Sequence, residues 1–287
     1  MTIQNAEEYA LRNGLFKVGA RPGIVSYVKE AIRRLDFAYT MSSYSNEAAN
    51  AKSRLGSWWN VLLPTIQAAT YGLVFGLILG SNKPENFLAY LFTGVFLFSY
   101  MQGSFTNGSS AIISNAGLVR SLSFPRVLLP LSVVISQTIT LLPQLAVLAV
   151  ILIGTGQTIS WSWFMLVPIT ALMFVFNFGL ATIMARVTVH IRDLNKIVPF
   201  ITRLLFYVSG VFFSVDKIFV NNPDSIYAFL IKLNPIYNFL NLARSSVLNN
   251  FTATSGEWIS VIIWSFGLAA FGLFFFWGAE ERYGRDL

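Results

Sequence analysis

The chain has 287 residues, of which 55% are hydrophobic and only 11% are charged, and its formal net charge is +7. Soluble domains carry about a quarter charged residues, and several apolar runs of about 20 residues exclude a single soluble domain here. Cysteine is absent and His190 is the lone histidine, which excludes disulfides and thiolate sites and leaves little material for a metal centre. The composition predicts an all-α integral membrane protein without a metal site.

The segment before the first apolar run is polar, and we expect no cleavable signal peptide in it. Five of its apolar residues recur at helical spacing: Ile24, Val28, Ile32, Leu35 and Tyr39. Lys29, Arg33 and Arg34 fall largely on the other side, and a basic amphipathic helix before a first span is typical of the bilayer interface. We predict an interfacial helix over residues 24–39, which either only anchors the chain or also forms part of a docking surface. Residues 42–54 are expected to be a polar connector.

The first span is expected from about Trp58 to Leu79. Gly72, Gly76 and Gly80 recur there every four residues, and such a stripe of small side chains lets another helix backbone approach closely. The stripe fits packing within one subunit or between two subunits. Because a first span often lies at the edge of a bundle, we favour packing between two subunits.

The second span starts at Phe87 and is continuously apolar to about Met101. Residues 102–110 then bring in Gln, Ser, Thr and Asn side chains, among them Asn107. Polar side chains at membrane depth face the bundle interior or a water-filled cavity. This stretch is either a hydrophilic pathway that opens toward the cytosol or a helix packed by small residues and local hydrogen bonds.

The stretch Asn115–Leu131 is a short polar island between two long apolar runs, and it carries Arg120 and Arg126. Proline is tolerated where a helix starts and is costly inside one. Because Pro125 lies near the exit of the island, we predict a short helix from Asn115 to about Ser123, lying across the membrane surface. Such an element is well placed to be pushed by a soluble partner.

Four further apolar runs complete the pattern, at about residues 127–153, 161–189, 197–215 and 258–277. Between the last two runs, residues 226–233 and 236–247 are amphipathic or apolar, and Asn234-Pro235 between them is a turn signal. A re-entrant helical hairpin between spans five and six fits this segment better than a free loop. We therefore predict an N-terminal segment, a domain of six transmembrane helices and a tail, over residues 1–57, 58–278 and 279–287.

The basic residues predict the orientation. Fifteen of the 20 Lys and Arg residues fall on the same side of the predicted spans as the two termini, and four fall on the opposite side. Because Lys and Arg mark cytosolic loops, both termini are expected in the cytosol. The same rule explains the positive net charge without a nucleic-acid partner.

The sequence contains no recognisable set of catalytic residues. The run Gly14–Gly19 resembles a phosphate loop, but Ala20-Arg21 stands where Lys-Ser/Thr is needed. The acidic residues lie outside the predicted spans, which argues against coupling to protons or sodium. The chain is therefore either a pump that takes its energy from a partner or a passive channel, and we expect no cofactor in it.

Aromatic residues make up 15% of the chain. Their ring faces stack on sugar rings as well as on lipids and one another. Most are expected to pack or to face membrane lipids. A minority, together with Asn107, are candidates to line a conduit: Tyr71, Phe75, Phe98, Tyr100, Phe206, Tyr207, Phe212 and Phe213.

Three motifs carry a resemblance to a known family: N-x-x-L-V-x-S-x-x-F-P-R-x-x-L-P-L over residues 115–131, I-R-D-L after the fourth span and N-P-I-Y at residues 234–237. With the interfacial helix and the six spans, the chain resembles the membrane subunit of type-2 ATP-binding-cassette exporters over about residues 24–280. It is similar above all to the polysaccharide branch, which exports O-antigen, teichoic acid or cell-wall galactan.

The resemblance implies a homodimer in a bacterial inner or plasma membrane, bound to two separate ATPase subunits that hold ATP and magnesium. It implies a glycan substrate on an undecaprenyl diphosphate lipid. The helix over residues 115–123 would be a cytosolic coupling helix seated in a groove of the ATPase, beside the interfacial helix. The residues implied in coupling are Asn115, Leu118, Arg120, Phe124, Pro125 and Arg126, with Ile32 and Arg33 next to them.

Two alternatives stand beside this hypothesis. The first is an exporter of drugs or lipids with the same fold, whose pathway would be narrower and less aromatic. The second comes from another class, a membrane glycosyltransferase or flippase that acts alone. That function would require intramembrane carboxylates, and the acidic residues of the sequence lie outside the predicted spans.

Overall fold

The structure of the chain, a computed structural model, describes residues 22–51, 53–80, 83–215 and 225–283. The run at residues 14–19 lies outside these residues, and so do parts of the predicted N-terminal segment, of the segment between spans five and six and of the tail. Across the described part, all regular structure is helical and no strand is present. The prediction of an all-α protein is confirmed there.

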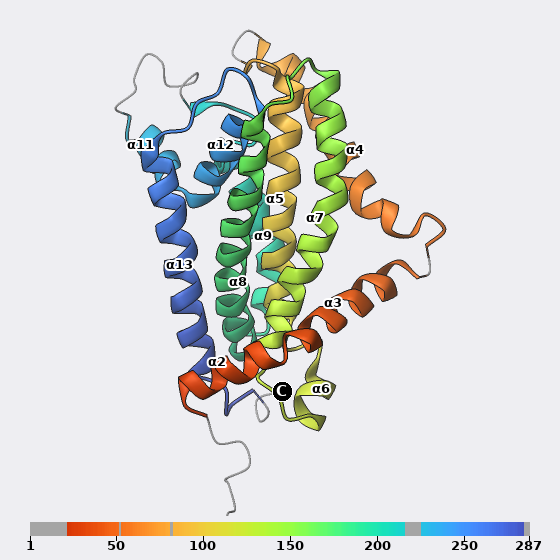
Figure 1. Cartoon of the computed structure of the whole chain (residues 1–287), viewed down its shortest axis with the longest axis vertical. Coiled ribbons are helices and arrows are strands. Elements are labelled where there is room, and N and C mark those ends of the chain that lie inside the picture. The colour runs from red at the N-terminus through yellow and green to blue at the C-terminus, as the bar shows by residue number, and fades with distance from the viewer. Residues whose placement is uncertain (1–21, 52, 81–82, 216–224, 284–287) are drawn as a thin grey trace, which may run out of the picture.

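The helices and their bounds are α2 (Ile24–Arg33), α3 (Leu35–Asn50), α4 (Trp59–Ile78), α5 (Phe87–Ser110), α6 (Ala116–Ser121), α7 (Leu128–Gly154), α8 (Leu166–His190), α9 (Leu194–Val208), α11 (Ile226–Leu233), α12 (Pro235–Val247) and α13 (Ser255–Trp277). Short 3₁₀ turns precede α4 and α8, at Gly56–Trp58 and Trp161–Met165. In Figure 1 the long helices α5, α7, α8 and α13 run along one axis. α2, α3 and α6 lie at one end of this bundle, called the α6 end, and α11 and α12 lie at the other, called the α12 end.

Helix α5 is the centre of the bundle. Seventeen of its 24 residues are buried, and it packs against α4, α7, α8, α9 and α12. By contrast, α4 and α13 bury only a few residues each and leave apolar side chains such as Leu77 and Phe271 exposed. This pattern fits outer helices that face hydrocarbon, because lipid tails are as apolar as leucine.

Four segments of the described chain are long and apolar enough to cross a membrane: Gly56–Ile78, Leu128–Gly154, Trp161–His190 and Ser255–Trp277. They correspond to four of the six predicted spans. Helix α5 has 24 residues but carries the polar run at residues 102–110, and α9 has only 15 residues. A membrane-spanning helix needs about 20 apolar residues. The polar run of α5 and the short length of α9 therefore separate these two helices from the other four.

The prediction of a polar connector over residues 42–54 is wrong for most of its length, because α3 continues to Asn50. The single helix predicted over residues 24–39 is divided into α2 and α3 at Arg34. Serine and asparagine are weak helix formers, but the Ser136 hydroxyl of α7 donates to the Asn46 side chain of α3 at 2.6 Å. Contact with α7 therefore outweighs local propensity over this stretch.

The fifth predicted span is also shorter than expected, because α9 ends at Val208 and not near residue 215. Gly210 follows with φ +66°, a left-handed conformation that other residues rarely adopt. A Cβ at Gly210 would lie only 2.8 Å from the Tyr237 ring. The irregular residues 209–213 therefore depend on a glycine, and their carbonyls are left for partners from other helices.

The two short helices predicted between spans five and six are present as α11 and α12. Asn234 separates them, and its side chain accepts the Ile236 N–H at 3.0 Å. Pro235 occupies the first position of α12, where its missing N–H is not needed. Capping and proline chemistry thus fix the start of α12.

Candidate functional site

The short helix predicted after the second span is α6. Asn115 precedes it and donates from its side chain to a backbone carbonyl one turn earlier, at 2.8 Å. Val119 is buried and Leu118 is half-buried, whereas Arg120 is exposed. One side of α6 is therefore anchored to the bundle, and the other side lies at the surface.

The turn after α6 packs against α2 and α3. Pro125 is buried, and the ring centroid of Phe124 lies 5.0 Å from that of Phe37 on α3. Arg34, at the break between α2 and α3, donates to the Ser123 carbonyl at 3.0 Å. These contacts bind the turn to the two helices that cross the α6 end.

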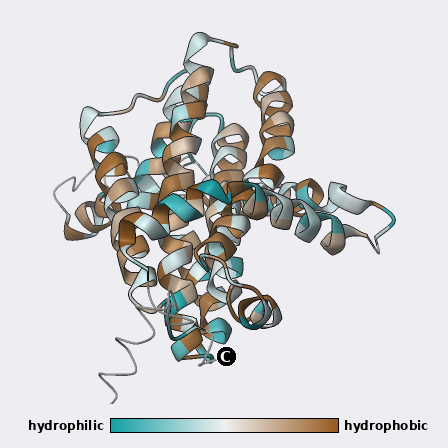
Figure 2. Ribbon diagram, turned by 60° about the horizontal axis from the view of Figure 1, so that its bottom comes forward, coloured by the Kyte–Doolittle hydropathy of each residue, from teal (hydrophilic) through white to brown (hydrophobic). Residues whose placement is uncertain are grey.

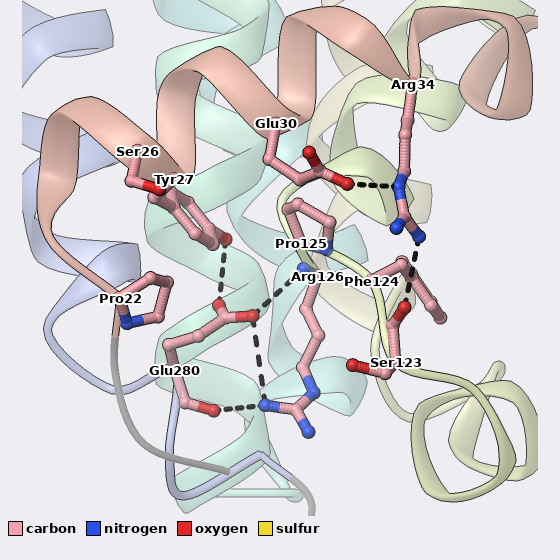
Figure 3. A pocket seen from close by; sticks show the side chains of 10 residues that line it. All are labelled: Pro22, Ser26, Tyr27, Glu30, Arg34, Ser123, Phe124, Pro125, Arg126 and Glu280. Carbon is pink, nitrogen blue, oxygen red and sulfur yellow. Dashed lines mark hydrogen bonds and ion pairs between the residues drawn. The ribbon is translucent and has the colours of Figure 1, made fainter. Parts of the chain in front are cut away.

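Beyond the turn, Tyr27 and Arg126 converge on Glu280 (Figure 3), and we call these three residues the Glu280 cluster. The Glu280 side chain accepts the Arg126 N–H at 3.0 Å and the Tyr27 hydroxyl at 2.8 Å. The Arg126 guanidinium donates to the backbone carbonyl of Glu280 and lies 3.8 Å from its carboxylate. The Tyr27 oxygen also accepts the Val127 N–H at 3.1 Å. A residue just after α13 thus joins α2 to the start of α7.

Burial sets the electrostatics of the Glu280 cluster, because Glu280 is only 6% exposed. Burial raises the pKa of the Glu280 carboxyl, against the opposing effects of the Arg126 N–H, the Tyr27 hydroxyl and the Arg126 charge. The pKa of Tyr27 is raised well above its ordinary value, first by burial and then by the neighbouring Glu280. A cavity of about 360 Å³ lies between α2, residues 123–126 and Glu280. The cluster is therefore buried but borders open space.

The two residues predicted beside the coupling helix, Ile32 and Arg33, lie on the outer face of α2. Both are exposed, whereas Tyr27 and Ala31 form the face that meets the bundle. Figure 2 brings the α6 end forward and shows hydrophilic residues among hydrophobic ones on the helices that cross it. Ile32 and Arg33 are thus available to lipid or to a partner at the same end as Arg120.

Six of the nine conduit candidates come together in one group, called the aromatic cluster: Tyr71, Phe75, Phe98, Phe206, Tyr207 and Phe212. Phe75 stacks on Phe212 with ring centroids 4.3 Å apart, and Phe206 meets Phe98 edge-on at 4.9 Å. Phe98, Phe206 and Phe212 are buried, while Tyr207 is 46% exposed. The cluster joins α4, α5 and α9 within one subunit, and its role in a conduit stays a prediction.

The other three conduit candidates lie apart from the aromatic cluster. Tyr100 is buried, with its hydroxyl 2.9 Å from the Thr138 hydroxyl. The Phe213 carbonyl accepts the Tyr90 hydroxyl at 2.7 Å. Asn107 is exposed and lines a polar cavity between α3, α5 and α7. The polar run of α5 thus reaches a cavity at Asn107.

The glycine stripe of the first span has contacts inside the chain. A Cβ at Gly72 would lie 3.2 Å from Leu88, and a Cβ at Gly76 would lie 3.8 Å from Phe87. Gly80 follows α4 with φ +51° and open space around an added Cβ. The contacts of Gly72 and Gly76 are with α5, which is the packing within one subunit that the sequence left as an alternative.

Sequence reasoning did not single out Arg244, which is buried in α12 with 0% of its surface exposed. Its guanidinium donates to the carbonyls of Tyr90, Gly210 and Val211 at 3.3, 3.0 and 3.1 Å, and it lies 3.4 Å from the centroid of the Tyr90 ring. Tyr27 and Glu280 were missed as well. For Arg244 one signal was available, since it lies four residues after Leu240 on the apolar side of the helix.

Comparison with known proteins gives independent evidence on the family of this chain. The model of the ABC-2 type transporter family matches residues 40–248. The O-antigen export system permease protein RfbA of Klebsiella pneumoniae is 28% identical over 237 residues, which cover 82% of this chain and 88% of that protein. A protein of the same name from Myxococcus xanthus is 28% identical over 188 residues, covering 66% of this chain and 71% of that protein. The polysialic acid transport protein KpsM of Escherichia coli is 23% identical over 203 residues, covering 69% and 75%.

The matched region begins within α3 and ends just after α12. It contains α6, the turn after it, the aromatic cluster and Arg244, whereas Tyr27 and Glu280 lie outside it. Because the match covers more than half of the sequence and includes the motif at residues 115–131, the chain belongs to the ABC-2 type transporter family.

Proposed function

We propose that this chain is the membrane subunit of an ATP-driven exporter that moves a polysaccharide out of the cytosol on an undecaprenyl diphosphate lipid. Family membership carries the proposal, together with the names of the relatives, which are export permeases for O-antigen and a transport protein for polysialic acid. Export of a drug or a lipid by the same fold is the competing function.

In this proposal the chain crosses a bacterial inner or plasma membrane six times, through α4, α5, α7, α8, α9 and α13. The α6 end and both termini face the cytosol, because most Lys and Arg residues lie in segments on that side. The helices α11 and α12 form a hairpin that re-enters the membrane from the other side and gates the exit. Two copies form a homodimer, and the glycan passes between them.

Energy enters through α6 from a separate ATPase subunit, which holds ATP and magnesium. The geometry supports this role, because α6 is anchored by Val119 and leaves Arg120 exposed. The turn after α6 is bound to α2, α3 and Glu280. A push on α6 therefore moves the start of α7 and the elements around it together, and does not merely bend an isolated loop.

Copurification of the ATPase with an Arg120→Glu variant tests this role. In this variant a negative charge replaces a positive one and is repelled by the ATPase groups that contact Arg120. Recovery of the ATPase and glycan-stimulated ATP hydrolysis should therefore fall about tenfold. Lys196→Glu is the matched control, because Lys196 is exposed in the first turn of α9 and pairs with Asp193 at the surface. Such an exposed pair contributes less than about 1 kcal/mol.

Normal recovery and normal hydrolysis with Arg120→Glu would remove α6 from the coupling role. A wild-type complex that exports a drug or a lipid, and no glycan, would favour the competing function.

A further inference from the structure

A polar cavity of about 610 Å³ opens between α3, α5 and α7, in the half of the bundle nearest α6. Eleven of its 14 lining residues carry a hydroxyl or a carboxamide, and none of the 14 is charged. The volume lies within the range of about 300–1,000 Å³ that is typical of small-molecule sites. A polar lining does not stabilise the acyl chains of a lipid, and a phosphate group is normally bound by Arg or Lys. The lining therefore suits an uncharged ligand rich in hydrogen-bonding groups.

A second cavity of about 210 Å³ continues the first, and both are lined by Asn60 and Gln137. Side chains four residues apart share one face of a helix, and four such residues of α7 line the two cavities: Ser132, Ser136, Thr140 and Gln144. The second cavity also brings in the partly exposed ring of Trp59. The two cavities together form one polar groove along α7, called the α7 track.

The α7 track offers both acceptors and donors. The hydroxyls of Ser132 and Thr140 donate to carbonyls of α7 at 2.7 and 3.0 Å, which leaves their oxygens as acceptors. Within the described residues, the side-chain amides of Asn107 and Gln137 have no hydrogen-bond partner, so their N–H groups are available as donors. Gly103 makes room for this arrangement, because a Cβ there would overlap the Gln137 amide.

We infer that the α7 track binds uncharged sugar units of the exported glycan inside a single subunit. The hydroxyls of a sugar ring both donate and accept hydrogen bonds, which matches a wall of hydroxyl oxygens and carboxamides. The Trp59 ring adds a face on which a sugar can stack. This inference rests on the proposed export function and adds the site within the subunit and the chemical class that it takes. The lipid diphosphate is held elsewhere in this inference, because no Lys or Arg of the described chain lines either cavity.

Thiol labelling tests the inference cleanly, since the chain has no native cysteine. Ser45 and Ser43 are a matched pair, because both are exposed on α3 but only Ser45 lines the track. The complex of permease and ATPase carries either Ser45→Cys or Ser43→Cys. Its rate of labelling by a small uncharged maleimide is measured in two kinds of membrane. One comes from cells that make the polymer, and the other comes from cells in which glycan synthesis stops after the first sugar on the lipid. Ser110→Cys, which also lies in the track, is measured alongside as a second position.

With the polymer present, labelling of Ser45→Cys and Ser110→Cys should slow about tenfold if the ligand is at about ten times its Kd. Labelling of Ser43→Cys should not change. Unchanged labelling at both track positions, in a complex that exports glycan, overturns the inference and leaves the export function standing. Equal slowing of labelling in the arrested cells assigns the site to the lipid headgroup. Equal slowing of labelling at Ser43→Cys indicates general shielding of the surface. Either result overturns the inference. A wild-type complex that exports no glycan overturns the inference and the export function together.

Discussion

Each end of the bundle holds irregular backbone in place with an arginine, but the arginines have different partners. At the α6 end, Arg126 meets the carboxylate and the carbonyl of Glu280. At the α12 end, Arg244 meets neutral carbonyls, including those of Gly210 and Val211, and the ring of Tyr90. Among the described residues, no carboxylate pairs with Arg244.

The difference suggests different degrees of adjustability. The Glu280 cluster contains a titratable acid and borders a cavity of about 360 Å³, so we expect pH and a bound partner to change its contacts. The backbone carbonyls of Tyr90, Gly210 and Val211 that accept from Arg244 do not titrate, and the Arg244 side chain is fully buried. We therefore expect the α6 end to be the adjustable end of the bundle and the α12 end to be the fixed one.

The largest effect is expected from Arg244→Met, which removes the donors of a fully buried cation. A buried acceptor left unpaired costs about 1–3 kcal/mol. The Gly210 carbonyl keeps a second donor, the Tyr90 hydroxyl, at 3.1 Å. The free energy of unfolding should therefore fall by about 2–4 kcal/mol in total, measured from the thermal unfolding of the purified protein in detergent. Arg203→Met, at an exposed position, should change it by less than about 0.5 kcal/mol, and equal unfolding midpoints for the two variants would contradict the fixed role of Arg244.

A smaller loss is expected from Glu280→Ala, which leaves the Arg126 N–H and the Tyr27 hydroxyl without their acceptor. The free energy of unfolding should fall by about 1–3 kcal/mol, and the amount of glycan exported per ATP hydrolysed should fall with it. Glu281→Ala serves as the control, because Glu281 is the exposed neighbour of Glu280. Full export per ATP with Glu280→Ala would show that the cluster has no part in coupling.

A third, still smaller effect is expected from Tyr27→Phe, which deletes the hydroxyl that joins Glu280 to the Val127 N–H. The loss of one hydroxyl at this point should lower the free energy of unfolding by about 1 kcal/mol. Tyr39→Phe is the matched variant, because Tyr39 is 60% exposed on α3. If both variants unfold at the wild-type temperature, the Tyr27 hydroxyl does not stabilise the α6 end.

The smallest effect is the pH dependence of the Glu280 cluster. Because burial raises the pKa of Glu280 above 4.5, the folded protein keeps this proton over a pH range in which the unfolded chain has lost it. Protonated Glu280 therefore stabilises the fold most below pH 4.5, and this contribution is lost as pH rises through the raised pKa. The unfolding midpoint of wild type, relative to Glu280→Gln, should fall over that range. A constant or rising difference would contradict the burial argument.

The elements that the sequence predicts well have signals within one or two turns of chain. The helix α6 follows Asn115 and ends before Pro125, and α12 starts at Asn234-Pro235. Caps and prolines act on neighbouring backbone. These boundaries therefore depend on residues that are adjacent in the sequence, and they are predicted to within a few residues.

The contacts that hold the two ends depend on residues far apart in the sequence, and no local pattern reveals them. Tyr27 and Glu280 are separated by 253 positions, and Arg244 and Tyr90 by 154. The helical residues 42–50 were missed for the same reason, because Asn46 is bound by Ser136, 90 residues later. Such pairs become visible only when the helices are placed together.

The polar run of α5 shows why one pattern fitted two interpretations. Ser104 is buried and donates to the Tyr100 carbonyl of its own helix at 2.9 Å, as local packing predicts. Asn107, one turn further on, is exposed and lines the 610 Å³ cavity, as a hydrophilic pathway predicts. The sequence could not separate the two interpretations, because each describes a different face of the same helix.

The central claim is that ATP-derived energy enters the bundle through α6, and a crosslink tests it directly. Gly117 on α6 and Gly154 at the C-terminal end of α7 both leave open space around an added Cβ. The chain contains no competing cysteine, so Gly117→Cys and Gly154→Cys are each treated with a short thiol-to-amine crosslinker in the complex with the ATPase. We expect a crosslinked ATPase band with Gly117→Cys and none with Gly154→Cys. A band of equal strength from both, or none from Gly117→Cys in a complex that copurifies intact, would contradict the claim.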